Sequence, residues 1–169
     1  MLELGKAGAH GYPKGELPVV RDGGVVAVLR ASSWKEAATA TVGDREWLFT
    51  KRKGELTARW ATEAEDAVRL RARQASFWKG TWTADLEGRT VEMETASFWK
   101  GTHRYLSGGQ RVAESGSTGG WSPRPTLDAD DSLPLHQQVF LLWLELVISR
   151  RNTAAVGAGA TAAVIGGTS

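Results

Sequence analysis

One segment, residues 133–151 with the sequence LPLHQQVFLLWLELVISRR, constrains the fold more than any other part of the chain. Between Val139 and Ile148 the only polar residue is Glu145, so at helical pitch apolar side chains point in every direction. A helix that is apolar all round is buried all round. The apolar run is about half of the roughly 20 residues that cross a bilayer, and two arginines follow it. We therefore favour a buried core helix over residues 133–151 and keep a membrane anchor as the weaker alternative.

The chain before this segment has the pattern of short strands joined by tight turns. One hexapeptide signature occurs three times, as ASSWKE at 31–36 and as ASFWKG at 75–80 and 96–101. The last two copies lie 21 residues apart, and the residues that follow them match as well. This period is too short for most solenoid repeats. It predicts a meander of hairpins in which each unit contains a strand, a corner, a second strand and a glycine turn.

The hairpin after the second copy can be aligned residue by residue. A two-residue turn at Glu87-Gly88 places Trp82 opposite Met93 and Ala84 opposite Val91. The apolar pairs then share one face and the polar pairs the other, as a half-buried antiparallel sheet requires.

The same alignment, moved to the next repeat, predicts that His103 lies opposite Glu114 and Tyr105 opposite Val112. We interpret His103 and Glu114 as a cross-strand pair on the surface.

The strand count and the apolar helix together predict the architecture. An eight-stranded barrel is just filled by its own side chains, whereas a helix is roughly 10–12 Å across. The bore must therefore be wider, as in eleven-stranded barrels that enclose a central helix. We predict a mainly β fold, an antiparallel barrel of about twelve strands closed around a hydrophobic C-terminal helix. The predicted parts are a flexible N-terminal arm at 1–16, the barrel with its helix at 17–151, and a flexible Gly/Ala-rich tail at 152–169.

Composition bears on the chemistry that the chain can support. The net charge of +2 does not favour nucleic acid as a partner. There is no cysteine and the three histidines are scattered, so we expect no metal and no cofactor. No catalytic motif is present, and we expect a protein that is not an enzyme. The N-terminus lacks the apolar run of a secretory signal, so the expected location is cytoplasmic, with peripheral attachment to a membrane left open.

The tryptophan-lysine corners at Trp34, Trp78 and Trp99 allow two interpretations. Aromatic rings beside basic groups can bind sugars, bases or membrane interfaces. Alternatively, each large ring fills a corner of the barrel while the lysine lies in water, and we favour this interpretation. Glu145 likewise allows two interpretations. It lies near an open barrel mouth, or it pairs with a basic group.

The best candidate for a binding site is a set of basic residues on neighbouring strands. Arginines at every second position of one strand share a face, and such a stripe suits phosphate groups. The alternative is a solvated surface balanced by nearby acidic residues. The stripe comprises Lys51, Arg52, Lys53, Arg69, Arg71 and Arg73.

The order of short antiparallel strands, repeated corners and a final hydrophobic helix resembles the tubby C-terminal-like superfamily, over residues 17–151. This superfamily includes tubby proteins, phospholipid scramblases and the plant LURP-one-related proteins. The resemblance implies binding of phosphoinositides or action at membranes. It matches no diagnostic motif, so no binding residue of the family is assigned to a position in this chain.

Three functions follow as hypotheses. The first is a non-enzymatic barrel that binds phosphoinositide or other anionic lipid headgroups through the basic stripe. The second is a carrier that holds a small apolar ligand in the bore, which requires that the helix leave room for it. The third is a structural or protein-interaction scaffold.

Overall fold

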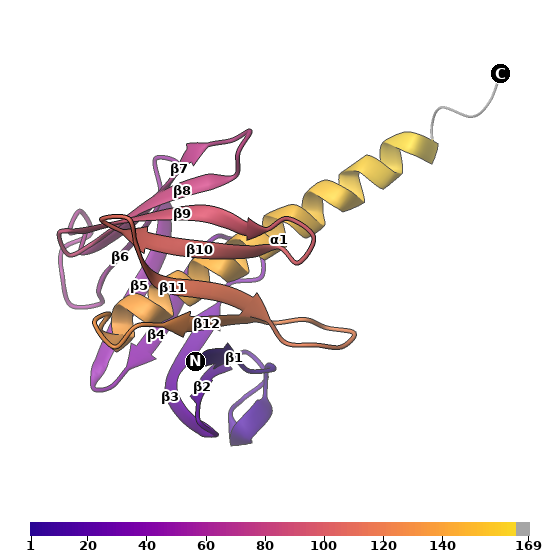
Figure 1. Cartoon of the computed structure of the whole chain (residues 1–169). Coiled ribbons are helices and arrows are strands. Elements are labelled where there is room, and N and C mark those ends of the chain that lie inside the picture. The colour runs from indigo at the N-terminus through magenta and orange to yellow at the C-terminus, as the bar shows by residue number, and fades with distance from the viewer. Residues whose placement is uncertain (165–169) are drawn as a thin grey trace.

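The computed structural model describes residues 1–164, with side chains through residue 158, and contains twelve strands followed by one long helix (Figure 1). The predicted mainly β barrel with a C-terminal helix is confirmed. The elements are β1 (Leu2–Leu4), a short 3-10 helix (Ala9–Gly11), β2 (Leu17–Arg21), β3 (Gly24–Ala31), β4 (Ala38–Val42), β5 (Arg45–Arg52), β6 (Glu55–Trp60), β7 (Leu70–Ser76), β8 (Thr81–Leu86), β9 (Arg89–Ser97), β10 (Thr102–Ser107), β11 (Gln110–Ser117), β12 (Pro125–Ala129) and α1 (Leu135–Val164).

The strands form one closed antiparallel barrel in which β1 completes the circle between β2 and β12. Leu2 lies opposite Leu127, and Leu4 lies opposite Val19. The prediction of a loose arm over residues 1–16 is therefore wrong for the first strand. Its two leucines are buried in the core, and their strand supplies the pairing that leaves the sheet without a free edge.

Helix α1 runs through the bore of the barrel (Figure 1). Its five consecutive residues from Phe140 to Leu144 are each no more than 1% exposed, so the prediction of a helix buried on every side is confirmed. Phe140 and Trp143 pack against Phe49 of β5, with ring centroids 5.5 Å and 5.1 Å from it. Small buried side chains all around the barrel make room for these large ones, and two of them lie directly beside Phe49 on the neighbouring strands. The buried alanines are Ala27, Ala38, Ala40, Ala58, Ala72, Ala84 and Ala113.

The helix is longer than the sequence predicted. It continues past Arg151 and extends out of the barrel as far as Val164 (Figure 1). Residues 152–164 are mostly alanine, threonine, valine and glycine. Alanine is the strongest helix former, and extension of an existing helix avoids the cost of nucleation. The predicted flexible tail is therefore wrong for residues 152–164, and residues 165–169 lie outside the described part of the chain.

The predicted register of the β8–β9 hairpin is confirmed. Trp82 lies opposite Met93, and Ala84 lies opposite Val91. The turn residues Glu87 and Gly88 have φ values of 54° and 92°, the left-handed conformation that a two-residue hairpin turn requires at both positions.

The register predicted for the next hairpin is wrong. Arg104, not His103, lies opposite Glu114, and Tyr105 lies opposite Ala113. A β-bulge between Tyr105 and Leu106 shifts the pairing by one residue. Such a bulge places two residues of one strand against one of the other, and here the extra residue is Val112 of β11, which moves Glu114 away from His103. His103 faces into the barrel on the same side of β10 as Tyr105 and is 8% exposed.

Candidate functional site

Helix α1 leaves the barrel at one end, which we call the exit end (Figure 1). Because the strands alternate in direction, this end also holds every second connection between strands. These connections are residues 5–16, 32–37, 53–54, 77–80, 98–101 and 118–124. All three tryptophan-lysine corners therefore lie together at the exit end, although they are far apart in the sequence.

The repeated hexapeptide forms its corner through its serine and its glycine. In the second copy the Ser76 hydroxyl accepts a hydrogen bond from the backbone N–H of Lys79, at 3.2 Å. Gly80, with φ of 62°, then takes the left-handed conformation that glycine tolerates best. The third copy repeats both features. Serine and glycine thus shape the turn, and the phenylalanine and tryptophan between them are left at its tip.

Six aromatic side chains at the exit end project into solvent, and we call them the aromatic rim. The interpretation that each tryptophan ring fills a corner of the barrel is wrong, because the three rings are 93% to 96% exposed. Monomeric soluble proteins rarely expose large apolar patches, and such patches usually mark binding surfaces. The rim comprises Trp34, Phe77, Trp78, Phe98, Trp99 and Trp121, which are 79% to 106% exposed.

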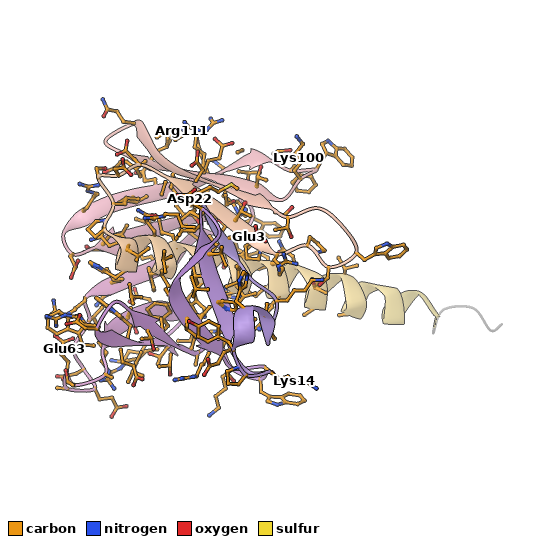
Figure 2. The ribbon with its side chains drawn as sticks, turned by 90° about the horizontal axis from the view of Figure 1, so that it is seen from below. Glu3, Lys14, Asp22, Glu63, Lys100 and Arg111 are labelled. Atoms are coloured by element: carbon orange, nitrogen blue, oxygen red, sulfur yellow. The ribbon has the colours of Figure 1, made fainter. Side chains whose placement is uncertain are left out.

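Charge is distributed unevenly between the two ends of the barrel. Every lysine of the chain lies in or beside a connection of the exit end, namely Lys6, Lys14, Lys35, Lys51, Lys53, Lys79 and Lys100. Every aspartate lies in or beside a connection that starts at the opposite end, namely Asp22, Asp44, Asp66, Asp85, Asp128, Asp130 and Asp131. Figure 2 shows Lys14 and Lys100 at the end from which α1 emerges and Glu63 at the other.

The structure divides the predicted basic stripe. Lys51, Arg52 and Lys53 lie at the β5–β6 turn of the exit end, where Lys51 pairs with Glu36 at 3.0 Å and Arg52 donates to the Glu65 carbonyl oxygen.

The three arginines of the stripe lie on the outer wall, as predicted, but two of them are paired with acidic neighbours. Arg69 lies 2.7 Å from Glu63 and stacks on the ring of Trp60, and Arg71 lies 3.3 Å from Glu55. Hydrogen bonding by Glu63 raises the pKa of Arg69. Arg73 is exposed on the same face. The six residues therefore do not form one continuous cationic surface.

One carboxylate ties the exit end to the helix. Glu36, in the 32–37 connection, accepts a hydrogen bond from Arg151 of α1 at 2.7 Å. Hydrogen bonding by Arg151, assisted by Lys51, lowers the pKa of Glu36 to about 2 against the opposing effect of burial. Arg150 donates to the Ser32 carbonyl oxygen at 2.8 Å, so two consecutive arginines hold this corner against the helix.

Glu145, the single charged residue of the apolar run, is buried and hydrogen-bonded by two side chains of β10. The Tyr105 hydroxyl donates to its carboxylate, and the Nδ1 atom of His103 lies 2.9 Å from it. Burial, together with the nearby negative charge of Glu145, raises the pKa of Tyr105 well above its ordinary value. Both interpretations of Glu145 hold, since it has a partner and also lies beside an opening at the exit end.

That opening is a pocket of about 210 Å³ between α1 and two connections, residues 98–101 and 118–124. We call it the His103 pocket. Its polar lining residues are Lys100, His103, Ser117, Arg124, Glu145, Ser149, Asn152 and Thr153. No group of three or more histidine, aspartate or glutamate side chains that could hold a metal ion occurs among the described residues.

Sequence reasoning identified the corners but missed that they share one end with the lysines, and it missed the His103 pocket. The shared end could have been found from the sequence, because connections two strands apart always lie at the same end of an antiparallel barrel. The pocket gave no such signal: the repeat aligns His103 with the inward-facing Trp82, but the opening beside it is formed by α1 and two connections that are far apart in the sequence.

Comparisons of the chain with protein-family models, with curated proteins and with solved structures find no match. The resemblance to the tubby-like superfamily therefore stays a prediction from the order of elements. No helix in the described part of the chain combines the length and hydropathy of a membrane span.

Proposed function

We propose that this chain is a peripheral membrane-binding protein that docks on anionic bilayers with its exit end. The observation that carries the proposal is the gathering of the aromatic rim and all seven lysines at the end from which α1 emerges. Tryptophan is enriched where proteins meet the interface between lipid headgroups and acyl chains. Lysines near that interface are attracted to anionic lipids by about 1 kcal/mol each. A bilayer offers both partners on one surface.

The helix supports the same orientation. Beyond Asn152 its sequence has no charged residue, and it extends out of the barrel at the exit end (Figure 1). With the exit end on a membrane, this segment would meet the lipid surface without burying a charge.

The other two hypotheses have less support. A carrier needs an empty bore, and the bore is occupied by the large side chains of α1. A protein-interaction scaffold would also use exposed aromatic residues. However, a protein partner would not need a lysine beside the tryptophan in all three corners.

The proposal can be tested by sedimentation with vesicles of phosphatidylcholine, with and without phosphatidylserine, at low and physiological salt. Replacing both Trp78 and Trp99 by serine removes two rim residues that are more than 90% exposed and lie outside the barrel core. Each buried aromatic side chain contributes about 1.5–3 kcal/mol, so even partial insertion of both predicts a loss of affinity of about tenfold or more. Wild-type binding should require phosphatidylserine and weaken with salt.

The matched control replaces Arg71 and Arg73, on the outer wall, by glutamine. If the aromatic rim carries the binding, this variant should lose clearly less affinity for the vesicles than the tryptophan variant, since exposed charges on the side wall contribute little. If the arginine variant lost most of its affinity for the vesicles and the tryptophan variant lost none, the basic stripe and not the exit end would be the binding site. Failure of the wild type to bind any vesicle would leave the scaffold hypothesis ahead.

A further inference from the structure

The His103 pocket opens at the exit end between the two connections that carry Trp99 and Trp121. Its volume of about 210 Å³ corresponds to about seven water molecules at liquid density. A pocket of this size holds a small polar group. If the exit end rests on a bilayer, as proposed above, the group that lies over its opening is a lipid headgroup.

The pocket is lined by polar side chains from four separate elements. Lys100 comes from the β9–β10 connection, His103 from β10, Arg124 from the β11–β12 connection and Ser149 from α1. Among the described residues, the Lys100 ammonium group makes no ion pair that would neutralise it. Arg124 is held in place by Glu3 and by the Leu4 carbonyl oxygen, each at 2.8 Å.

Glu145 does not leave the pocket with an unpaired negative charge. Its carboxylate accepts from Tyr105 and contacts Nδ1 of His103, and an ionised carboxylate can only accept. The Nδ1 atom of His103 therefore carries a proton. The Nε2 atom has no hydrogen-bond partner among the described residues and is not fully buried, so it is open to the pocket. With the proton on Nδ1, the Nε2 atom of the ring offers a lone pair that can contact a polar group in the pocket.

A second pocket of equal volume, about 210 Å³, lies on the other side of α1 and provides a contrast. It is lined by Glu36 and Arg151, which pair with each other. Arg151 is therefore neutralised there, but Lys35 and Arg150 also line this pocket and make no ion pair among the described residues, so the two pockets differ in the imidazole of His103 and not in unpaired positive charge.

We infer that the His103 pocket binds the phosphate group of an anionic membrane lipid, with the Lys100 ammonium group as its charged donor and the His103 ring beside the bound group. This inference rests on the proposed membrane-binding function and names its ligand. A phosphate group offers several charged acceptor oxygens, which suits a site where donors converge from several elements. The aromatic rim would bring the protein to the surface, and the pocket would select a headgroup there.

The repeat supplies a matched pair of variants. Lys79 and Lys100 occupy the same position in identical hexapeptides, and their backbone N–H groups make the same hydrogen bond to serine. Only Lys100 lines the His103 pocket. Lys79→Gln and Lys100→Gln therefore remove the same charge from equivalent exposed corners. The two variants differ in that only Lys100→Gln changes the lining of the His103 pocket.

The experiment is an NMR titration of the full chain with dihexanoyl phosphatidate kept below its micelle concentration. The inference predicts saturable shifts of the His103 ring signals. In Lys100→Gln the dissociation constant should rise about tenfold or more, as for the loss of one hydrogen bond to a charged group. In Lys79→Gln it should stay within about twofold of the wild type, since a distant exposed charge contributes little. Equal weakening in both variants, or no shift at His103, would overturn the inference.

Two further ligands distinguish the sources of phosphate. Dihexanoyl phosphatidylcholine has the same acyl chains but a zwitterionic headgroup with no net charge, and it should bind more weakly than phosphatidate. Inorganic phosphate that saturated the site with equal affinity would overturn the lipid assignment in favour of free phosphate. Because the titration contains no bilayer, it reports on the pocket even if vesicle binding by the aromatic rim fails.

Discussion

At the scale of single residues, Glu145 shows how a charge is accommodated inside an otherwise apolar helix. A buried carboxylate is costly unless donors satisfy it, and β10 supplies two, from His103 and Tyr105. The two donors alternate with the outward-facing Arg104, so a single strand brings both to the same side of the helix. This contact also fixes how far α1 is inserted into the barrel, because a shift by one turn would leave all three groups unpaired.

Removal of the Glu145 carboxylate should lower the free energy of unfolding much more than removal of an exposed carboxylate. Glu145→Ala leaves two buried groups without their acceptor and should lower the free energy of unfolding by about 3–5 kcal/mol. Tyr105→Phe removes one donor and should cost about 1–3 kcal/mol. Urea denaturation monitored by tryptophan fluorescence measures both.

Glu114→Gln is the control, because Glu114 is the partner that simple hairpin alignment assigns to His103 and it lies on the outer face. Its cost should stay within about 0.5 kcal/mol, as for most surface substitutions. Equal costs for Glu114→Gln and Glu145→Ala would contradict the buried hydrogen bonds.

At the scale of elements, the helix and the strands are held together at the exit end by an ion pair. Glu36 of the β3–β4 connection bonds to Arg151, close to the point where α1 leaves the barrel. The pKa of Glu36 falls from 4.5 to about 2 in the folded protein. Because the folded value is the lower one, the stabilisation is present above pH 4.5 and is lost as the pH falls towards 2.

Glu36→Gln should therefore lower the free energy of unfolding at neutral pH by about 1–2 kcal/mol, a value reduced by the partial exposure of the pair. The difference from the wild type should shrink as the pH is lowered from 4.5 to about 2. Thermal denaturation across this range measures it, with the exposed Glu92→Gln as a control that should follow the wild type. A difference that did not change with pH would show that Glu36 acts through packing and not through its charge.

The elements are also where prediction from the sequence succeeded best. The apolar run around Trp143 required a buried helix, and the sorting of apolar pairs at Trp82 and Ala84 fixed one hairpin. The same alignment failed at His103 because a bulge needs only a small change in strand twist, which composition does not mark. Exposure of the corner tryptophans could not be read locally, because it depends on whether the interior is already full.

At the scale of the whole molecule, the separation of lysines and aspartates gives the barrel a charge asymmetry along the axis of α1. An asymmetric charge distribution steers a molecule in the field of a charged surface, so the exit end should turn towards an anionic bilayer before the aromatic rim touches it. Steering of this kind weakens as salt shortens the Debye length.

The orientation can be measured directly, because the chain has no cysteine and single cysteines can be introduced and labelled. An environment-sensitive fluorophore at Ser33→Cys, in the 32–37 connection, should shift its emission to the blue on addition of phosphatidylserine vesicles. The same label at Thr62→Cys, in the connection at the opposite end, should not shift. Similar shifts at both positions would contradict docking by the exit end.

The closure of the barrel by β1 and β12 has a consequence for folding during synthesis on the ribosome. Leu2 pairs with Leu127, so β1 cannot form this pairing until β12 has been synthesised. At about 5–20 residues per second, this wait is about 6–25 seconds. Throughout that time the inner faces of the strands have no helix to cover them, since α1 follows β12 in the chain. Until α1 has been synthesised, the nascent barrel is therefore open at its edges and empty inside, so we expect it to expose apolar surface of the kind that chaperones bind.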